Sequence, residues 1–284
     1  MLDYLSYIIF RISGFIIRLL PVEFSLFFAR RIGELFYLFD FKHRSVVFAN
    51  IRLAFADEKS CSQIKNITKQ FYRNLAQNFI EIFFIPLVDS RYISKYVKIE
   101  GRDNIKKALD KGRGVILLGV HAGSWEISNV LFANMGFTFN LLVRAQGMPK
   151  LNSLLDSYRR NKGCKLIRRQ NEVRELIEAL KNNQAVGMTM DQGGKSGEQV
   201  KFLGKFASMA TGAVKLALKY GAVIVPGYYT REKGPYIKVI LGEPFEVKKS
   251  SVSQDDIVSN TRDLTKIFEE FIEKYPQDYF WRYK

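Results

Sequence analysis

Two side chains near the middle of the chain have the types and the spacing for acid–base chemistry. His121 and Glu126 are five residues apart. On one ideal helix this spacing turns the second side chain by roughly 500°, about 140° off the face of the first, so the two would not meet. They can meet if His121 lies in a loop before the helix that carries Glu126. A carboxylate on one imidazole nitrogen fixes the tautomer and raises the basicity of the ring, so the pair predicts a general base.

The neighbouring residues predict such a loop. Residues 115–120 form a continuous apolar run between glycines, which is typical of a strand buried on both faces. His121 follows the end of this run, and Ser124 is a suitable N-cap for the next helix. We therefore expect His121 at the end of a strand and Glu126 in the first turn of the following helix.

A second apolar run ends in polar residues in the same way. Asp191 and Gln192 come directly after residues 185–190. In α/β sheets ligands gather outside the carboxyl ends of the strands, so these two side chains are candidates for substrate binding. A cap on the turn is the alternative role for Asp191.

Past residue 97, short apolar runs alternate with amphipathic segments, which predicts an α/β fold. We expect a mixed, mostly parallel sheet flanked by helices, in which a turn over residues 231–235 makes the last two strands an antiparallel hairpin. The expected strands are residues 115–120, 138–143, 185–190, 222–229 and 236–241, and the expected helices are about 125–134, 150–161, 171–182, 208–220 and 253–274.

The N-terminal part of the chain is predicted to form hydrophobic helices. Residues 4–20 are strongly apolar, and Arg11 and Arg18 fall on one narrow polar stripe of a helix. This pattern suits a helix in the membrane interface whose arginines reach lipid phosphates. A helix that spans the membrane and a helix buried in the core are the two alternatives.

A second helix is expected over residues 22–39, with Arg30 and Glu34 paired at i,i+4 on its polar side. Together the two helices suggest a division of the chain into two parts. We expect residues 1–40 to be a hydrophobic helical membrane-attachment segment and residues 41–284 to be the catalytic domain.

Composition narrows the possible partners. The 44 Lys and Arg against 28 Asp and Glu give a net charge of +16, which attracts anionic membranes, phosphorylated lipids, acidic proteins and nucleic acid. The 23 Phe and 14 Tyr favour a membrane surface, and no motif for nucleic acid is present. Cys61 and Cys164 lack the spacing of a metal site, which indicates a reduced compartment, and with two histidines in the chain we expect no metal.

The His-x4-acid spacing at a strand end resembles the membrane glycerolipid acyltransferases of the lysophospholipid acyltransferase superfamily. Those enzymes usually carry Asp at the position of Glu126 and Asn at the position of Val120. In both departures this sequence resembles the branch of late (lauroyl/myristoyl) lipid A acyltransferases. That branch carries further short motifs, and they occur here in a similar order: Asp191-Gln192, Phe202-Leu203-Gly204, Ala210-Thr211-Gly212, Val225-Pro226, Tyr275-Pro276 and Trp281.

The resemblance implies an acyltransferase at the cytoplasmic face of the inner membrane. It would move a fatty acyl chain from an acyl carrier protein thioester to a hydroxyl of a lipid A precursor, a glycolipid, without a cofactor. His121 and Glu126 would be the general base pair. An arginine at the mouth of the site is best matched by Arg159, with Arg160 and Arg144 as the alternatives. The substrate-binding residues are then expected to be Arg159, Arg144, Asp191 and Gln192.

Two other functions stay open from the sequence. The acceptor could be a lysophospholipid or another glycolipid. A non-catalytic basic protein that binds membrane or nucleic acid would also explain the charge, although it gives no reason for the placement of His121 and Glu126.

The aromatic residue Trp281 near the C-terminus is expected to act as an interfacial anchor.

Overall fold

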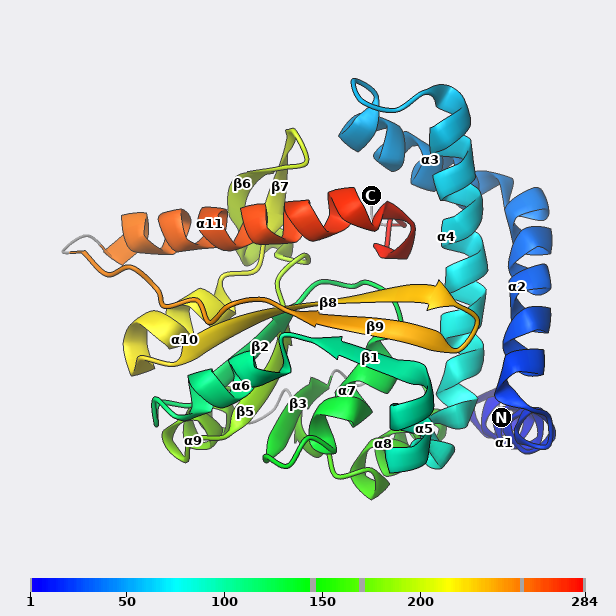
Figure 1. Ribbon diagram of the computed structural model, residues 1–284, viewed down its shortest axis with the longest axis horizontal. Coiled ribbons are helices and arrows are strands. Elements are labelled where there is room, and N and C mark those ends of the chain that lie inside the picture. The colour runs from blue at the N-terminus through cyan, green and yellow to red at the C-terminus, as the bar shows by residue number, and fades with distance from the viewer. Residues whose placement is uncertain (1, 144–146, 169–171, 251–252, 283–284) are drawn as a thin grey trace.

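A seven-stranded sheet forms the centre of the computed structural model, which describes residues 2–143, 147–168, 172–250 and 253–282 (Figure 1). Its strands lie in the order β1, β9, β8, β2, β5, β3, β4. Their bounds are β1 Val97–Glu100, β2 Val115–Gly119, β3 Phe139–Val143, β4 Lys165–Arg168, β5 Ala185–Thr189, β8 Val223–Lys233 and β9 Tyr236–Leu241. A separate antiparallel pair consists of β6 (Glu198–Phe202) and β7 (Lys205–Met209).

Parallel pairing dominates the large sheet. β2 pairs in parallel with β5 and with β8, whereas β8 and β9 form an antiparallel hairpin. The expected mixed, mostly parallel sheet with its C-terminal hairpin is therefore confirmed. The short strands β1 and β4 and the β6–β7 pair were not predicted. The helix expected from residue 208 begins later, at Gly212, because residues 205–209 form β7.

The central strand β2 is buried along its whole length, as its apolar run predicts. Because side chains alternate across a strand, Ile116 and Leu118 enter one core, and Val115 and Leu117 enter the other. The first core is covered by α3 (Phe41–Phe55), α4 (Cys61–Glu81), α9 (Glu172–Lys181), α10 (Gly212–Tyr220) and α11 (Ser253–Lys274). The second is covered by η1 (Ile82–Leu87), α6 (Arg102–Leu109) and α7 (Trp125–Ala133), and the remaining helices are α5 (Ser90–Tyr96), α8 (Pro149–Asn161), η2 (Gly194–Ser196) and η3 (Pro276–Asp278).

Two N-terminal helices contribute no fully buried side chain to these two cores. They are α1 (Leu2–Arg18) and α2 (Val22–Phe39), and α2 stands beside α4 at the end of the sheet toward which β8 points (Figure 1). The close packing of α2 on α4 requires glycine at position 33, because a Cβ there would lie 2.5 Å from the carbonyl oxygen of Tyr72. Within the described residues, no helix combines the length and the apolar character needed to cross a bilayer.

The expected pair of Arg30 with Glu34 is wrong. Glu34 instead binds the guanidinium groups of Arg31, at 2.9 Å, and Arg73, at 2.5 Å. Because Arg73 belongs to α4, the Glu34 carboxylate lies between the two packed helices. Arg31 binds it from the preceding turn of α2. Arg30 consequently points elsewhere and lines a cleft described below.

Candidate functional site

The loop after β2 places His121 at the carboxyl edge of the sheet. Three residues separate it from α7, and among them Gly123 adopts a φ of 52°. A Cβ at Gly123 would lie 2.5 Å from the carbonyl oxygen of Tyr229 on β8. Only glycine fits this close approach with a left-handed backbone. The sequence-based expectation that His121 lies in a loop between a strand and a helix beginning near Trp125 is confirmed.

The C-terminal segment fixes this loop in place. The backbone N–H of Gly123 donates to the carbonyl of Asp278 at 2.9 Å, and that of Phe280 donates to the carbonyl of His121 at 2.8 Å. The buried carboxylate of Asp278 accepts hydrogen bonds from Asn74 and Thr230, each at 2.7 Å. Burial raises the pKa of Asp278 to about 6, although these donors oppose the rise.

The interpretation of Trp281 as an interfacial anchor is wrong. Its side chain is buried, packs edge-on against Phe55 and Tyr279, and donates through Nε1 to the carbonyl of Pro276 at 2.6 Å. The aromatic ending of the chain therefore supports the His121 loop from inside the fold.

The carboxylate on the His121 ring comes from Asp191. Nδ1 of His121 lies 2.8 Å from Oδ1 of Asp191, and the backbone N–H of His121 donates to Oδ2 at 3.0 Å. The Asp191 side chain is fully buried, whereas that of His121 is 27% exposed. A buried carboxylate on Nδ1 holds the ring in one tautomer and stabilises the imidazolium. The arrangement can therefore take a proton at Nε2.

Sheet register explains why these two residues meet. Gly119 of β2 and Thr189 of β5 are paired neighbours in the parallel register. His121 and Asp191 each lie two residues beyond these positions, at the same edge. Gln192 follows Asp191, and its Nε2 lies 3.0 Å from Nδ1 and 3.2 Å from Nε2 of His121.

Glu126 has a different partner from the one that its spacing suggests. Its carboxylate binds the guanidinium of Arg159 through two contacts, Nε to Oε2 at 3.0 Å and Nη2 to Oε1 at 2.5 Å. The expected contact between His121 and Glu126 is thus replaced by two separate pairs. Both Glu126 and Arg159 are largely buried, with 15% of each side chain exposed.

Arg159 is held in its charged form from two sides. Burial alone would lower the pKa of Arg159, but the hydrogen bond and charge of Glu126, together with Asp156, raise it above its ordinary value. Asp156 lies one turn earlier on α8 and accepts from Nη1 of Arg159 at 3.2 Å. A fixed, permanently charged guanidinium next to Glu126 is suited to a phosphate or to a developing oxyanion.

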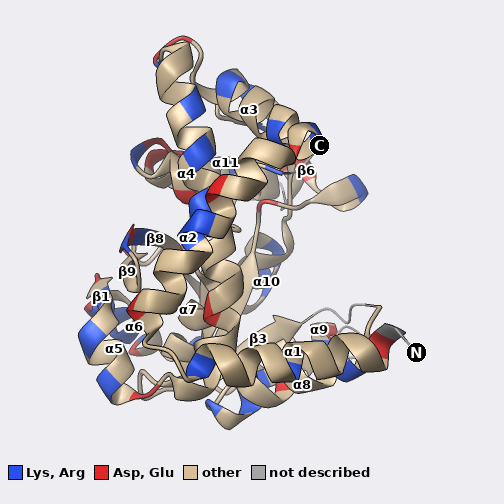
Figure 2. Ribbon diagram, turned by 90° about the vertical axis from the view of Figure 1, so that its right-hand side faces the viewer, with Lys and Arg blue, Asp and Glu red and all other residues tan. Residues whose placement is uncertain are grey.

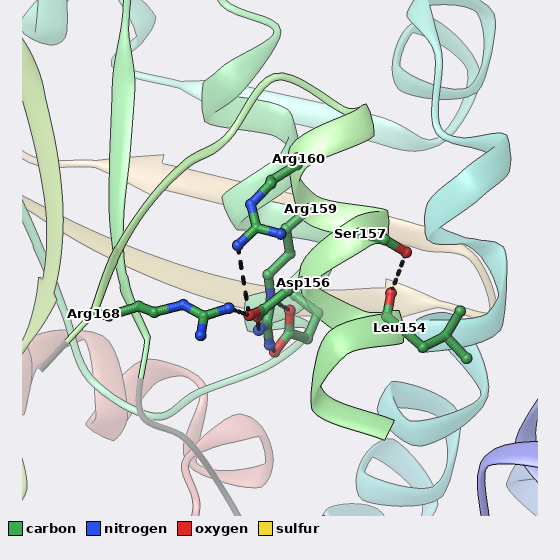
Figure 3. Close-up of polar contacts among 7 residues, drawn as sticks. Leu154, Asp156, Ser157, Arg159, Arg160 and Arg168 are labelled. Atoms are coloured by element: carbon green, nitrogen blue, oxygen red, sulfur yellow. Dashed lines mark hydrogen bonds and ion pairs between the residues drawn. The ribbon is translucent and has the colours of Figure 1, made fainter. Parts of the chain in front are cut away.

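Asp156 also gathers two arginines that extend toward solvent. Arg168 donates to Oδ2 of Asp156 at 3.0 Å, and Arg160 lies 3.9 Å from the same oxygen (Figure 3). These arginines are more than half exposed, so the network runs from buried Arg159 to a basic surface. Arg144, the other arginine predicted to bind substrate, lies outside the described residues.

A narrow pocket opens beside the start of α7. Ser124 contributes a hydroxyl that is buried and, among the described residues, has no hydrogen-bond partner. Ser124 is the N-cap residue as expected, but its side chain makes no capping bond. The pocket is lined by Asn78, Phe79, Ile82, Ser124, Trp125 and Glu126.

One buried ion pair near the loop gave no sequence signal. Arg231 of β8 binds both carboxylate oxygens of Glu81 on α4, at 2.7 and 2.6 Å, and its second Nη donates to Asn78 at 2.6 Å. Asn78 in turn donates to the carbonyl of Gly123 at 2.8 Å. This chain of contacts ties α4 and β8 to the His121 loop. Across the described residues, no three His, Cys, Asp or Glu side chains are grouped so as to hold a metal ion.

Comparisons with known proteins place the chain in a family. The profile of the family described as "Bacterial lipid A biosynthesis acyltransferase" matches residues 1–284. The chain is 27% identical over 271 residues to the lipid A biosynthesis palmitoleoyltransferase of Escherichia coli K12, covering 92% of this chain and 84% of that protein. It is 23% identical over 261 residues to the lipid A biosynthesis lauroyltransferase of the same organism, covering 89% and 82%.

The name of a third relative gives a different class of lipid as its acceptor. The chain is 25% identical over 209 residues to the phosphatidylinositol mannoside acyltransferase of Mycolicibacterium smegmatis, covering 72% of this chain and 67% of that protein.

Proposed function

This chain belongs to the bacterial lipid A biosynthesis acyltransferase family, and from that premise we propose that it transfers a fatty acyl chain from an acyl carrier protein thioester to a hydroxyl of a lipid A precursor. It is an acyltransferase, which excludes the alternative of a non-catalytic basic protein. The observation that carries the proposal is the pair of His121 with buried Asp191 at the carboxyl edge of the sheet.

In the proposed mechanism, His121 is the general base. Nε2 takes the proton of the acceptor hydroxyl while its oxygen attacks the thioester carbonyl. The new C–O bond forms, the C–S bond breaks, and the proton passes from Nε2 to the departing thiolate. Asp191 stabilises the imidazolium between these two transfers, a role that the sequence had suggested for Glu126. Gln192 holds the ring from its exposed side.

Glu126 takes a supporting role in this mechanism. Its two contacts fix the guanidinium of Arg159, which supplies positive charge near the reacting carbonyl or a lipid phosphate. Asp156 restrains the same guanidinium from α8. Loss of Glu126 would therefore reduce transfer through a displaced Arg159.

An acyl carrier protein donor suits the basic surface beyond Arg159. Acidic carrier proteins are attracted by clustered exposed cations. Exposed cations continue outward from the site at Arg160, Lys165 and Arg168, and Lys162 between α8 and β4 is half-buried.

We also propose that α1 and α2 attach the enzyme to the cytoplasmic face of the inner membrane. These helices meet on one side of the molecule, and most of their ribbon is neither Lys or Arg nor Asp or Glu (Figure 2). A contiguous exposed apolar surface of this size is typical of a membrane or protein contact. Its large side chains, each at least 41% exposed, are Tyr4, Leu5, Ile9, Ile12, Phe15, Ile16, Leu19, Leu20, Phe24, Phe27, Phe28, Ile32, Leu35, Phe36, Leu38 and Phe39.

Acylation of another glycolipid is the second candidate function, and similarity to a phosphatidylinositol mannoside acyltransferase favours it. One experiment compares three acceptors. Purified enzyme and acyl carrier protein thioester are incubated in three parallel reactions, which contain an underacylated lipid A precursor, a mannosylated phosphatidylinositol or a lysophospholipid. The masses of the products are measured by mass spectrometry. A mass gain of one acyl chain on the lipid A precursor alone supports the first proposal. A gain on another acceptor alone would replace it, and parallel reactions with acyl coenzyme A identify the donor.

A further inference from the structure

A polar cleft of about 330 Å³ lies apart from the His121 pair, between α2, α4, the β8–β9 turn and η3. Its walls come from four segments distant in the sequence, which meet only in the folded chain. Hydrogen-bonding side chains dominate the lining, and the ones that matter here are Arg30, Gln70, Asn74, Gln77, Lys233 and Gln277.

Several of the polar groups in the cleft are already satisfied by the protein. Arg231, also in the lining, is neutralised by Glu81, and Asn74 donates to Asp278. Gln77 donates to the carbonyl of Leu26 at 3.2 Å. These groups form a rigid wall, which leaves recognition of a ligand to the other side chains.

The side chains that face the cleft without an ion pair give it a positive charge. Among the described residues, Arg30 and Lys233 make no salt bridge, and Glu232 is the one unpaired carboxylate in the lining. Two cations against one anion leave a net charge of +1. Glu34 does not neutralise Arg30, because Arg31 and Arg73 occupy its carboxylate. An anion is therefore the complementary ligand.

The cleft opens beside the apolar surface of α2. Arg30 follows Phe27 by three residues, so the two are neighbours on the helix surface. Phe27 is 50% exposed and belongs to the surface proposed to contact the membrane. When that surface lies in the acyl region of a leaflet, Arg30 lies near the level of the lipid headgroups.

We propose that this cleft binds the phosphate-bearing headgroup of an anionic membrane phospholipid, an inference that rests on the proposed attachment of the enzyme to the membrane. Arg30 presents a planar fork of N–H donors to the phosphate oxygens, and Lys233 adds a second charged donor. The amides of Gln70 and Gln277 lie in the same lining and suit the glycerol hydroxyls of the headgroup. The site would hold the enzyme at a defined height and orientation on the bilayer.

Binding of the full-length protein to vesicles tests the proposal without any turnover. Vesicles of phosphatidylcholine with and without phosphatidylglycerol are titrated with wild type, Arg30→Gln and Lys233→Gln. The matched control is Arg31→Gln, which removes the same charge one residue away, where the side chain binds Glu34 outside the cleft. We expect Arg30→Gln to weaken binding to the phosphatidylglycerol vesicles about 10- to 100-fold, as for a lost hydrogen bond to a charged group. Arg31→Gln should cost about fivefold or less, the effect of one surface charge near an anionic leaflet.

Each result has one meaning. Equal losses for Arg30→Gln and Arg31→Gln would overturn the site and leave a diffuse electrostatic attraction. Wild type that binds neither kind of vesicle would overturn both the site and membrane attachment, while acyl transfer in detergent would still report on the catalytic proposal. Binding of millimolar glycerol 3-phosphate is measured in parallel by calorimetry, and if wild type binds this soluble phosphoester through Arg30 but Arg30→Gln and wild type bind the phosphatidylglycerol vesicles equally, the ligand is a free phosphoester and the lipid assignment is wrong.

Discussion

Replacing Asp191 with asparagine perturbs the proposed base at one point. Asp191 accepts two hydrogen bonds from His121, one from the backbone N–H at 3.0 Å and one at ring Nδ1 at 2.8 Å. An amide of the same shape has one oxygen that accepts and one nitrogen that donates. The backbone N–H can only donate, so the amide oxygen stays with it and the NH₂ group faces Nδ1.

This change predicts both the direction and the size of the effect. Nδ1 must then accept a hydrogen bond, which moves the ring proton to Nε2 and blocks its use as a base. The negative charge that stabilises the imidazolium is lost as well, in a side chain with no exposure to water. A positioned acid–base group contributes typically about 10²- to 10⁴-fold, which corresponds to roughly 3–5 kcal/mol in the barrier. We therefore expect Asp191→Asn to lower kcat by that factor with a much smaller change in KM.

The assay is initial-rate transfer from acyl carrier protein thioester to the lipid acceptor, with thermal unfolding of each variant measured in parallel. Asp256→Asn is the matched control, because Asp256 is another buried carboxylate that accepts a backbone N–H, that of Ser250 at 2.9 Å, at the start of α11. The control should keep the wild-type kcat. If a well-folded Asp191→Asn variant also keeps it, the assignment of Asp191 as the partner of the base is refuted.

Three further predictions concern the residues that support the site. Glu81→Gln should destabilise the fold by about 3–5 kcal/mol in urea unfolding, since Arg231 is left buried without its counter-ion; a loss below 1 kcal/mol would contradict this. Gly123→Ala should greatly reduce kcat, because its Cβ would displace the loop from Tyr229, and a normal rate would show that the loop adapts. Burial raises the pKa of Asp278 from 3.8 to about 6, so the folded state binds more protons in this window and wild type should lose stability relative to Asp278→Asn as the pH rises from about 4 to about 6; unfolding free energies whose difference does not change with pH would count against it.

The sequence predicted what depends on local pattern. The apolar run of β2, the loop after it and the start of α7 are read from consecutive residues, and all three are present in the structure. The mostly parallel character of the sheet and the β8–β9 hairpin also follow from patterning and turn residues. Short strands such as β4, with four residues, carry too little periodicity to be recognised.

The sequence did not predict which charged groups meet across long separations. Glu126 is close to His121 along the chain, but Asp191 reaches the ring because β5 lies beside β2 in a register that the sequence does not display. Glu81 and Arg231 are 150 residues apart and each resembles an ordinary surface charge. Arg159 was identified by position in the resembled family, and its partner Glu126 became visible only in the folded chain.

The proposed reaction is tested most directly by the mass of a lipid A precursor after incubation with acyl carrier protein thioester and purified enzyme, wild type or His121→Ala. Wild type should add the mass of one acyl chain, and His121→Ala should add none while unfolding at the same temperature as wild type. A His121→Ala protein that still acylates the precursor at the wild-type rate would contradict the central claim that His121 is the base.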